Sequence, residues 1–294
     1  MSPRATLDIV SLSDLHLDYR ANWQVAEAMA YRLIELAPDV LVLAGDLASI
    51  PSRVEKALTF FKDMAPDVVF VPGNHDLWAP TAEEKKLDEI DTWVMYRQVY
   101  AEMCDQLGIH YLPRAPLIKG EVALVGTCGW YDYSIASPLA RLLHSRDEFA
   151  EKAKGTARWT DGWRVRWRDD AGEVMPDEAV TRIMEADLKA QLDGLPPAVS
   201  KVVAVTHHLA FKEACTGHGG LAGDYFTAFM GSTGLGEILA ADPRVGLAIF
   251  GHLHKLTDVR VGRVRAVARP LGNPRDYKGE PKDVARERMG VFEV

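Results

Sequence analysis

The stretch Val68-Val69-Phe70-Val71-Pro72-Gly73-Asn74-His75-Asp76 joins four apolar residues, a Pro-Gly break and three polar side chains. An apolar run of this length, bounded by turn residues, predicts a strand that is buried on both faces of a sheet. In open α/β sheets, the loops that leave the carboxyl ends of such strands carry the functional residues. The polar triplet at the end of this run is therefore the first candidate for a functional site.

Four other apolar runs end at an Asp or a His in the same way. They are residues 9–13 before Asp14 and His16, 40–44 before Asp46, 202–206 before His207, and 247–250 before His252 and His254. Helical patterns at 25–37 and at about 52–64 separate the apolar runs at 9–13, 40–44 and 68–71. Strands that alternate with helices pair in parallel, so we predict an α/β fold whose strand ends bring these polar residues together.

The chain of 294 residues is long enough for one large α/β domain or two small ones. Its N-terminal residues lack the apolar core of a signal peptide, and no apolar run approaches the length of a membrane span. Three widely spaced cysteines indicate neither a disulfide framework nor a cysteine zinc site. We therefore expect a cytoplasmic protein with no membrane partner. The net charge of -8 argues against nucleic acid as a partner, because polyanion binding needs clustered Lys and Arg.

Between Pro138 and Pro197 the strand pattern disappears, and two helical segments flank a polar stretch at 155–176. We interpret residues 1–294 as a single domain with a cap or insertion at about 137–198. Residues 158–168 interleave basic and aromatic side chains, which is typical of a stacking surface for nucleotides. The alternative is a hairpin whose tryptophans cover the insertion's own core. We favour the alternative because Asp161, Asp169 and Asp170 reduce the local positive charge.

The polar residues at the five strand ends offer carboxylate oxygen, amide oxygen and imidazole nitrogen, and no thiolate. Such ligands suit manganese, iron, zinc, cobalt or magnesium and disfavour copper(I) and iron-sulfur clusters. The set is too large for one tetrahedral ion and matches two ions that share a bridging carboxylate. Two ions roughly 3.5–4 Å apart can bind both a hydroxide and a phosphoryl oxygen. The candidates are Asp14, His16, Asp46, Asn74, His75, His207, His252 and His254.

In their order, these motifs resemble the calcineurin-like metallophosphoesterase superfamily. The matching blocks are Asp14-x-His16, Gly45-Asp46, Gly73-Asn74-His75-Asp76, His207 and Gly251-His252-x-His254. The resemblance extends from residue 14 to residue 254 and covers all five signature blocks of the family. It implies a four-layer αββα sandwich of two mixed β-sheets. It also implies two divalent metal ions, with manganese as the first candidate and iron, zinc, cobalt or magnesium as alternatives.

The resemblance further implies a role for each residue. The first ion would be held by Asp14, His16, Asp46 and His254. The second would be held by Asp46 as the bridge together with Asn74, His207 and His252. His75 would be the catalytic residue that protonates the leaving oxygen or stabilises its developing charge. The nucleophile would be a hydroxide held between the ions, attacking in line at phosphorus without a phospho-enzyme intermediate.

Two departures distinguish the chain from the protein serine/threonine phosphatase branch of that family. Ser49 stands where that branch has the Asp that orients its catalytic His, and Asp76 stands where it has Glu. The sequence therefore favours small-molecule phosphodiesters as substrates and leaves open what orients His75. A phosphomonoesterase or a nucleotide pyrophosphohydrolase with the same ligand set is the alternative. A catalytically silent interaction scaffold would have lost ligands, and none is missing. His218, between glycines after the strand that ends at His207, is a candidate substrate contact.

Overall fold

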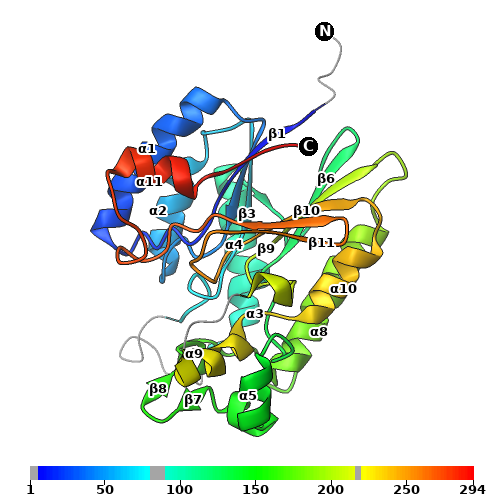
Figure 1. Cartoon of the computed structure of the whole chain (residues 1–294). Coiled ribbons are helices and arrows are strands. Elements are labelled where there is room, and N and C mark those ends of the chain that lie inside the picture. The colour runs from blue at the N-terminus through cyan, green and yellow to red at the C-terminus, as the bar shows by residue number, and fades with distance from the viewer. Residues whose placement is uncertain (1–5, 80–89, 216–219) are drawn as a thin grey trace.

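Two mixed β-sheets form the centre of the computed structural model, which describes residues 6–79, 90–215 and 220–294 (Figure 1). The first sheet has the order β13-β1-β2-β3-β4, with bounds Gly290–Glu293, Asp8–Leu12, Val40–Ala44, Asp67–Val71 and His110–Tyr111. The second has the order β11-β12-β10-β9-β6-β5, with bounds Thr257–Val261, Val264–Ala268, Val245–Phe250, Lys201–Thr206, Val122–Thr127 and Leu117–Lys119. The inner strands pair in parallel, and the antiparallel pairs β13 with β1, β11 with β12 and β5 with β6 lie at the edges.

Alternate residues of each inner strand pack into different layers, which explains why these strands are apolar throughout. In β2, Val40 and Val42 face the second sheet, whereas Leu41 and Leu43 pack towards helices. In β9, Val203 and Val205 face the first sheet in the same way. Three apolar layers therefore separate helix, sheet, sheet and helix, because side chains alternate along a strand. The predicted four-layer αββα sandwich is confirmed.

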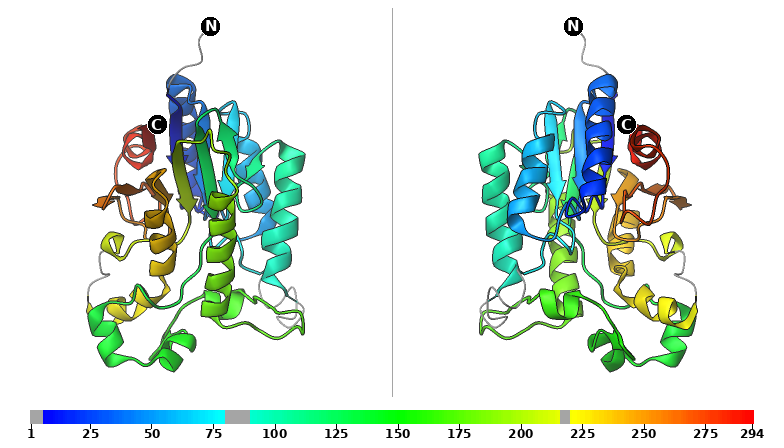
Figure 2. Two further views of the ribbon diagram at one scale, coloured as in Figure 1. Left: turned by 90° about the vertical axis from the view of Figure 1, so that its right-hand side faces the viewer. Right: turned by 90° about the vertical axis from the view of Figure 1, so that its left-hand side faces the viewer.

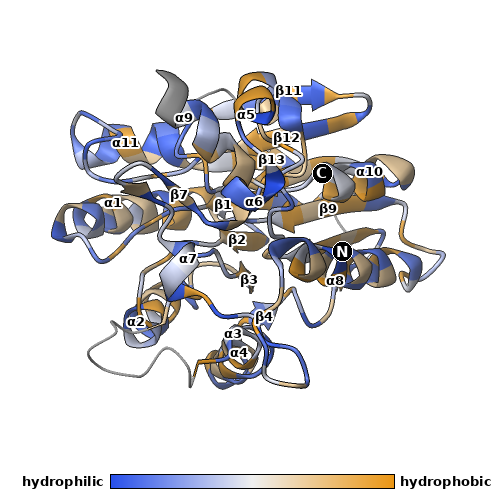
Figure 3. Cartoon of the chain, turned by 90° about the horizontal axis from the view of Figure 1, so that it is seen from below, coloured by the Kyte–Doolittle hydropathy of each residue, from blue (hydrophilic) through white to orange (hydrophobic). Residues whose placement is uncertain are grey.

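The outer layers consist of helices on both sides of the paired sheets (Figure 3). Those against the first sheet are α1 (Arg20–Leu36), α2 (Pro51–Phe61), α4 (Tyr100–Leu107) and α11 (Pro281–Arg288). Those against the second are α8 (Asp177–Asp193) and α10 (Thr233–Ala241). Among the described residues, none of the helices combines the length and the apolar character that crossing a bilayer requires.

The spacing of apolar residues at 81–107 also predicts a helix, and the structure divides the part that it describes into three segments. Residues 80–89 lie outside the described residues, and the helix described here begins with α3 (Thr92–Val94). The Asp91 carboxylate caps it by accepting a hydrogen bond from the Trp93 amide at 2.9 Å. A π-helical turn, Met95–Val99, then joins α3 to α4. The cap and the π-turn depend on single local contacts, which the apolar pattern alone does not reveal.

Residues 137–176 lie beyond one end of the sheets, on the side of α9 (Gly220–Phe226) (Figure 2). They contain α5 (Pro138–Leu143), α6 (Arg146–Ala150), the pair β7 (Ala153–Lys154) and β8 (Ala157–Arg158), and α7 (Asp161–Arg164). Two 3-10 turns, Lys212–Ala214 and Thr227–Phe229, flank α9. Within this region Trp167 is buried against Trp93 and Trp130, which lie outside the insertion, so this tryptophan belongs to the main core. The division into one domain with an insertion at about 137–198 stays a prediction.

Candidate metal centre

The structure brings all seven predicted metal ligands together where the carboxyl ends of β1, β2, β3, β9 and β10 meet. Potential ligand atoms lie within 4.8 Å of one another in two groups, namely Asp14, His16, Asp46 and His254, and Asp46, His207 and His252. Asn74 joins the second group, with its Oδ1 3.2 Å from His207 Nε2 and 3.0 Å from His252 Nδ1. Asp46 belongs to both groups, which is the arrangement a bridging carboxylate needs. His218 lies outside the described residues, so its role stays a prediction.

The backbone at the predicted ligands is strained. Five of the seven residues have a left-handed conformation: Asp14 (φ 52°), His16 (φ 40°), Asp46 (φ 55°), His252 (φ 70°) and His254 (φ 54°). A residue with a Cβ rarely adopts this conformation, because the Cβ crowds its own backbone. Such strain persists only where the surrounding structure imposes it, and it is concentrated at functional sites.

Glycines in the matching motifs allow the strand ends to approach closely. A Cβ on Gly73 would lie 2.1 Å from Asp46 Oδ1 and 2.6 Å from the Asp46 backbone nitrogen. A Cβ on Gly251 would lie 2.6 Å from Asp14 Oδ2. Both distances are shorter than any van der Waals contact, so only glycine fits beside these two carboxylates.

Replacing Gly73 with Ala should therefore displace Asp46 and reduce metal binding. Overpacking of this kind costs about 1–3 kcal/mol of unfolding free energy, and here it also moves a ligand. Metal content after dialysis and the melting temperature are the measurements. Gly246→Ala in β10 is the matched control, since a Cβ there meets nothing within 4 Å. A Gly73→Ala protein with full metal content and an unchanged melting temperature would show that the backbone can retreat.

Hydrogen bonds fix the tautomers of the histidines in the second group. His207 Nδ1 lies 3.0 Å from the Ala44 carbonyl oxygen, and His252 Nε2 lies 3.2 Å from the Phe229 carbonyl oxygen. A carbonyl oxygen only accepts, so these two nitrogens carry the ring protons. The remaining nitrogens, His207 Nε2 and His252 Nδ1, consequently present lone pairs to Asn74 Oδ1.

Asn74 completes this convergence of lone pairs. Its Nδ2 donates to Asp161 Oδ1 at 3.0 Å, so its oxygen is the atom that faces the two imidazoles. Asp46 Oδ1 lies 3.3 Å from His207 Nε2 as well. Neutral imidazoles would therefore face acceptor atoms. Burial lowers the pKa of His207, but Asp46 outweighs burial and raises that pKa to about 9, so a proton is favoured between these atoms. A divalent cation supplies the same positive charge and can replace that proton. The donor set of oxygen and imidazole nitrogen therefore fits a metal ion.

In the first group, Asp14 also presents an oxygen that fits a bound cation. Its Oδ1 accepts a hydrogen bond from the His252 amide at 2.8 Å, whereas its Oδ2 is buried without a hydrogen-bond partner. Buried carboxylate oxygens nearly always have a partner, so Oδ2 fits a metal ligand. On the opposite side of this group, His16 Nε2 and His254 Nε2 lie 2.8 Å apart. The residues present in both groups thus fit two bound cations.

Asp276 is a functional candidate that the sequence analysis missed. Its Oδ2 lies 3.1 Å from His254 Nδ1, which leaves His254 Nε2 directed at the first group. The hydrogen bond from His254 lowers the pKa of Asp276 to about 2. A carboxylate on the outer nitrogen of a ligating histidine fixes its tautomer and orientation. The only signal in the sequence was its place beside Arg275 and Tyr277 in a polar loop.

Asp76 supports the loops that carry Asp46 and Asn74. Its carboxylate accepts hydrogen bonds from four backbone amides, those of Asp46, Gly73, Leu47 and Ala48, at 2.8–3.1 Å. Burial and the neighbouring Asp46 raise the pKa of Asp76, whereas the amide donors favour its ionised form. Asp76 therefore joins the loop after β2 to the loop after β3.

His75 is held by an aromatic stack. Its ring lies on the Trp78 indole, with the centroids 3.6 Å apart and the planes at 29°, and about a quarter of its side chain is exposed (26%). Its backbone amide donates to Asp46 Oδ1 at 2.9 Å. Burial lowers the pKa of His75 to about 4, and Asp46 opposes that shift by favouring the protonated ring. The Ser49 hydroxyl donates to Asp18 instead, so the stack on Trp78 takes the place of the orienting Asp.

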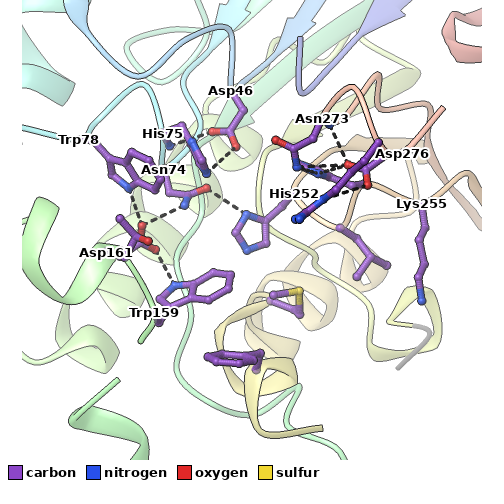
Figure 4. Close-up of a pocket in the computed structure, with 16 residues that line it drawn as sticks. Asp46, Asn74, His75, Trp78, Trp159, Asp161, His252, Lys255, Asn273 and Asp276 are labelled. Atoms are coloured by element: carbon purple, nitrogen blue, oxygen red, sulfur yellow. Dashed lines mark hydrogen bonds and ion pairs between the residues drawn. The ribbon is translucent and has the colours of Figure 1, made fainter. Parts of the chain in front are cut away.

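A cavity of about 660 Å³ opens beside the two groups (Figure 4). One side is formed by Asp46, Asn74, His75, His252 and His254. The lining also includes four apolar side chains, Trp159, Phe226, Met230 and Leu253. Two cationic side chains, Lys255 and Arg275, also line the cavity. The cavity therefore combines a polar floor with an apolar wall and positive charge.

Residues 7–256 match the family model of the calcineurin-like phosphoesterases. The chain belongs to this family, and with its two converging ligand groups it is a metal-dependent phosphoester hydrolase. The resemblance seen in the five sequence blocks is thereby confirmed.

Comparison with individual proteins identifies a more particular relative. Over 283 residues the chain is 26% identical to the acyl-carrier-protein phosphodiesterase PptH of Mycobacterium tuberculosis, covering 91% of this chain and 78% of the relative. The crystal structure of phosphopantetheinyl hydrolase (PptH) from Mycobacterium tuberculosis superposes with a TM-score of 0.71 at 21% identity. That superposition covers 91% of this chain and 90% of the other, and it supports the fold described above.

Proposed function

We propose that the chain is a phosphodiesterase that releases the phosphopantetheine group from an acyl carrier protein. The observation that carries the proposal is the cavity of about 660 Å³, whose floor is the pair of ligand groups and whose wall is apolar. The similarity to PptH over nine-tenths of the chain supports the choice of substrate. A long, partly apolar arm needs such a wall, whereas a simple phosphate monoester does not.

In this proposal the two groups of side chains hold one divalent ion each. The first group is Asp14, His16, Asp46 and His254, and the second is Asp46, Asn74, His207 and His252. Manganese is the first candidate, with iron, zinc, cobalt and magnesium as alternatives. Bound ions at these positions supply Lewis acidity to phosphoryl oxygens and lower the pKa of bound water.

The remaining steps depend on the chain's own residues. Asp46 and Asn74 fix the spacing of the two groups, so that the phosphorus is held in one orientation. His75 stands at the exposed side of the centre and donates its ring N–H to the leaving oxygen. Trp159 and Phe226 exclude water from the arm of the substrate, and Arg275, 86% exposed, adds positive charge to the lining of the cavity.

The direct test uses a carrier protein that bears its phosphopantetheine arm. Incubation with the manganese-loaded enzyme should yield the carrier protein without the arm, detected by mass spectrometry of the intact protein. Chelation should abolish the reaction. A synthetic aryl phosphodiester and the matching aryl phosphomonoester, assayed side by side, report on the reaction class, and we expect the diester to be favoured.

The outcomes separate the two parts of the proposal. If the enzyme hydrolyses the aryl diester but leaves the phosphopantetheine arm on the carrier protein, the phosphodiesterase activity is supported and the proposed substrate is rejected. Preference for the monoester would reject the phosphodiesterase activity itself.

The proposal includes a reducing, cytoplasmic setting, because all three cysteines are free thiols.

A further inference from the structure

Asp161 is a buried carboxylate that lies between the metal centre and the wall of the cavity (Figure 4). It opens the short helix α7 in the insertion and is 1% exposed. Its Oδ1 accepts hydrogen bonds from Asn74 Nδ2 at 3.0 Å and from Trp78 Nε1 at 2.7 Å. Its Oδ2 accepts from Trp159 Nε1 at 2.8 Å and from the Tyr131 hydroxyl at 3.3 Å. All four partners are donors. Asn74, Trp78 and Trp159 line the cavity, and Asn74 is also a predicted metal ligand.

The hydrogen bond to Asn74 determines which end of the amide faces the metal centre. An amide has one accepting oxygen and one donating nitrogen, and a half-turn exchanges them. Only the oxygen can ligate a cation, and here it faces the lone pairs of His207 and His252. Asp161 accepts only, so it binds the nitrogen end and excludes the turned amide.

The hydrogen bond to Trp78 acts on the predicted catalytic residue. Trp78 stacks on the His75 ring at 3.6 Å, and its Nε1 is the atom that Asp161 holds. The hydrogen bond to Trp159 acts on the other side of the centre. Trp159 packs edge-on against His252, with the centroids 5.7 Å apart, and stacks on Phe229, whose carbonyl binds His252.

We infer that Asp161 is a positioning residue that orients Asn74 towards the second ion and, through Trp78, orients His75 towards the substrate. The insertion therefore contributes to the geometry of metal binding as well as to the cavity wall. This inference concerns ligand geometry and holds for any phosphodiester, so it does not depend on the carrier-protein substrate proposed above.

Asp177 provides a matched control for Asp161. It is also buried, at 6% exposure, and accepts hydrogen bonds from Trp130 Nε1 at 2.8 Å and the Tyr133 hydroxyl at 2.5 Å. Its third partner is the Lys152 ammonium at 2.8 Å. None of these donors is a predicted metal ligand. Asp177→Asn thus reproduces the loss of a buried carboxylate in the same region without touching the centre.

The test compares Asp161→Asn, Asp177→Asn and wild type in metal-free form, titrated with manganese by calorimetry. An asparagine at 161 has one accepting oxygen for four donors, and that oxygen lacks the negative charge that strengthens the hydrogen bond to Asn74 Nδ2. Wild type and Asp177→Asn should bind two ions, and Asp161→Asn should bind the second ion about 10–100-fold more weakly. In the same variant, kcat on an aryl phosphodiester should fall at saturating metal, with KM little changed.

A second readout needs no metal and no turnover. In metal-free wild type, the Asn74 side-chain amide should exchange slowly with solvent in ¹⁵N NMR, and Asp161→Asn should abolish that protection. If Asp161→Asn does not fold, Trp78→Phe keeps the ring and removes one donor, and it should lower kcat while both ions stay bound. The inference would be overturned if Asp161→Asn bound both ions with the affinities of wild type. It would also be overturned if Asp177→Asn lost affinity for the second ion as strongly as Asp161→Asn does.

Discussion

Replacing Asp46 with Asn should remove both metal ions and lower kcat further than any other single substitution in the centre. Asp46 belongs to both ligand groups, with Oδ1 3.3 Å from His207 Nε2 and Oδ2 3.8 Å from His16 Nε2. Burial alone would raise its pKa, but His207 and His75 hold the pKa well below its usual range. An amide would lack the charge and would direct N–H hydrogens at one of these imidazoles. Elemental analysis of the dialysed protein measures the loss.

Asp276→Asn is the control, because the only predicted ligand that the Asp276 carboxylate contacts is His254, at its outer nitrogen. Loss of an outer hydrogen-bond partner costs about 10–100-fold in metal affinity, and the loss in Asp46→Asn should exceed that range for both ions. The bridging role is rejected if Asp46→Asn retains two ions at full occupancy. Loss of one ion alone would assign Asp46 to a single group.

His75→Ala should retain both ions and lower kcat by about 10²–10⁴-fold, the usual contribution of a proton donor. Its backbone amide, which donates to Asp46 Oδ1, persists in the variant, so the ligand stays in place. The loss should be larger for diesters with an alkyl leaving group than for nitrophenyl diesters, since a nitrophenolate leaves without a proton. Steady-state kinetics over a series of leaving groups, together with metal analysis, measure both effects.

His110→Ala is the matched histidine control. His110 lies in β4 and its Nε2 is 2.7 Å from the Ala115 carbonyl oxygen, remote from the ligand groups. We expect unchanged kinetics for it. A loss in His75→Ala that is independent of the leaving group, or one that accompanies loss of metal, would speak against proton donation.

The sequence predicts the sheets and the ligand groups because both leave local signals. Uninterrupted apolar runs such as residues 40–44 arise where alternate side chains enter two different apolar layers. Each ligand directly follows such a run, so the edge at which they meet follows from parallel pairing. The helix at 92–107 was less predictable, since its cap and its π-turn depend on single contacts.

The positioning residues could not be predicted, because they act across long separations in the chain. Asp161 is 87 residues from Asn74, and its hydrogen bond leaves no periodic trace. In the sequence Asp161 is one negative charge beside arginines, whereas in the structure it is buried. The three tryptophans of 158–168 have different surroundings: Trp167 is buried in the main core, Trp159 lines the cavity and Trp163 is exposed.

The left-handed backbone at five ligands has a consequence for the lifetime of the protein. A residue with a Cβ in that conformation costs roughly 1 kcal/mol or more, and a folded domain is stable by only about 5–15 kcal/mol. Ions that bind the folded chain offset this cost by mass action, by an amount that grows with the logarithm of their concentration. Metal supply would then govern how much of the protein persists against proteolysis, in addition to how much of it is active.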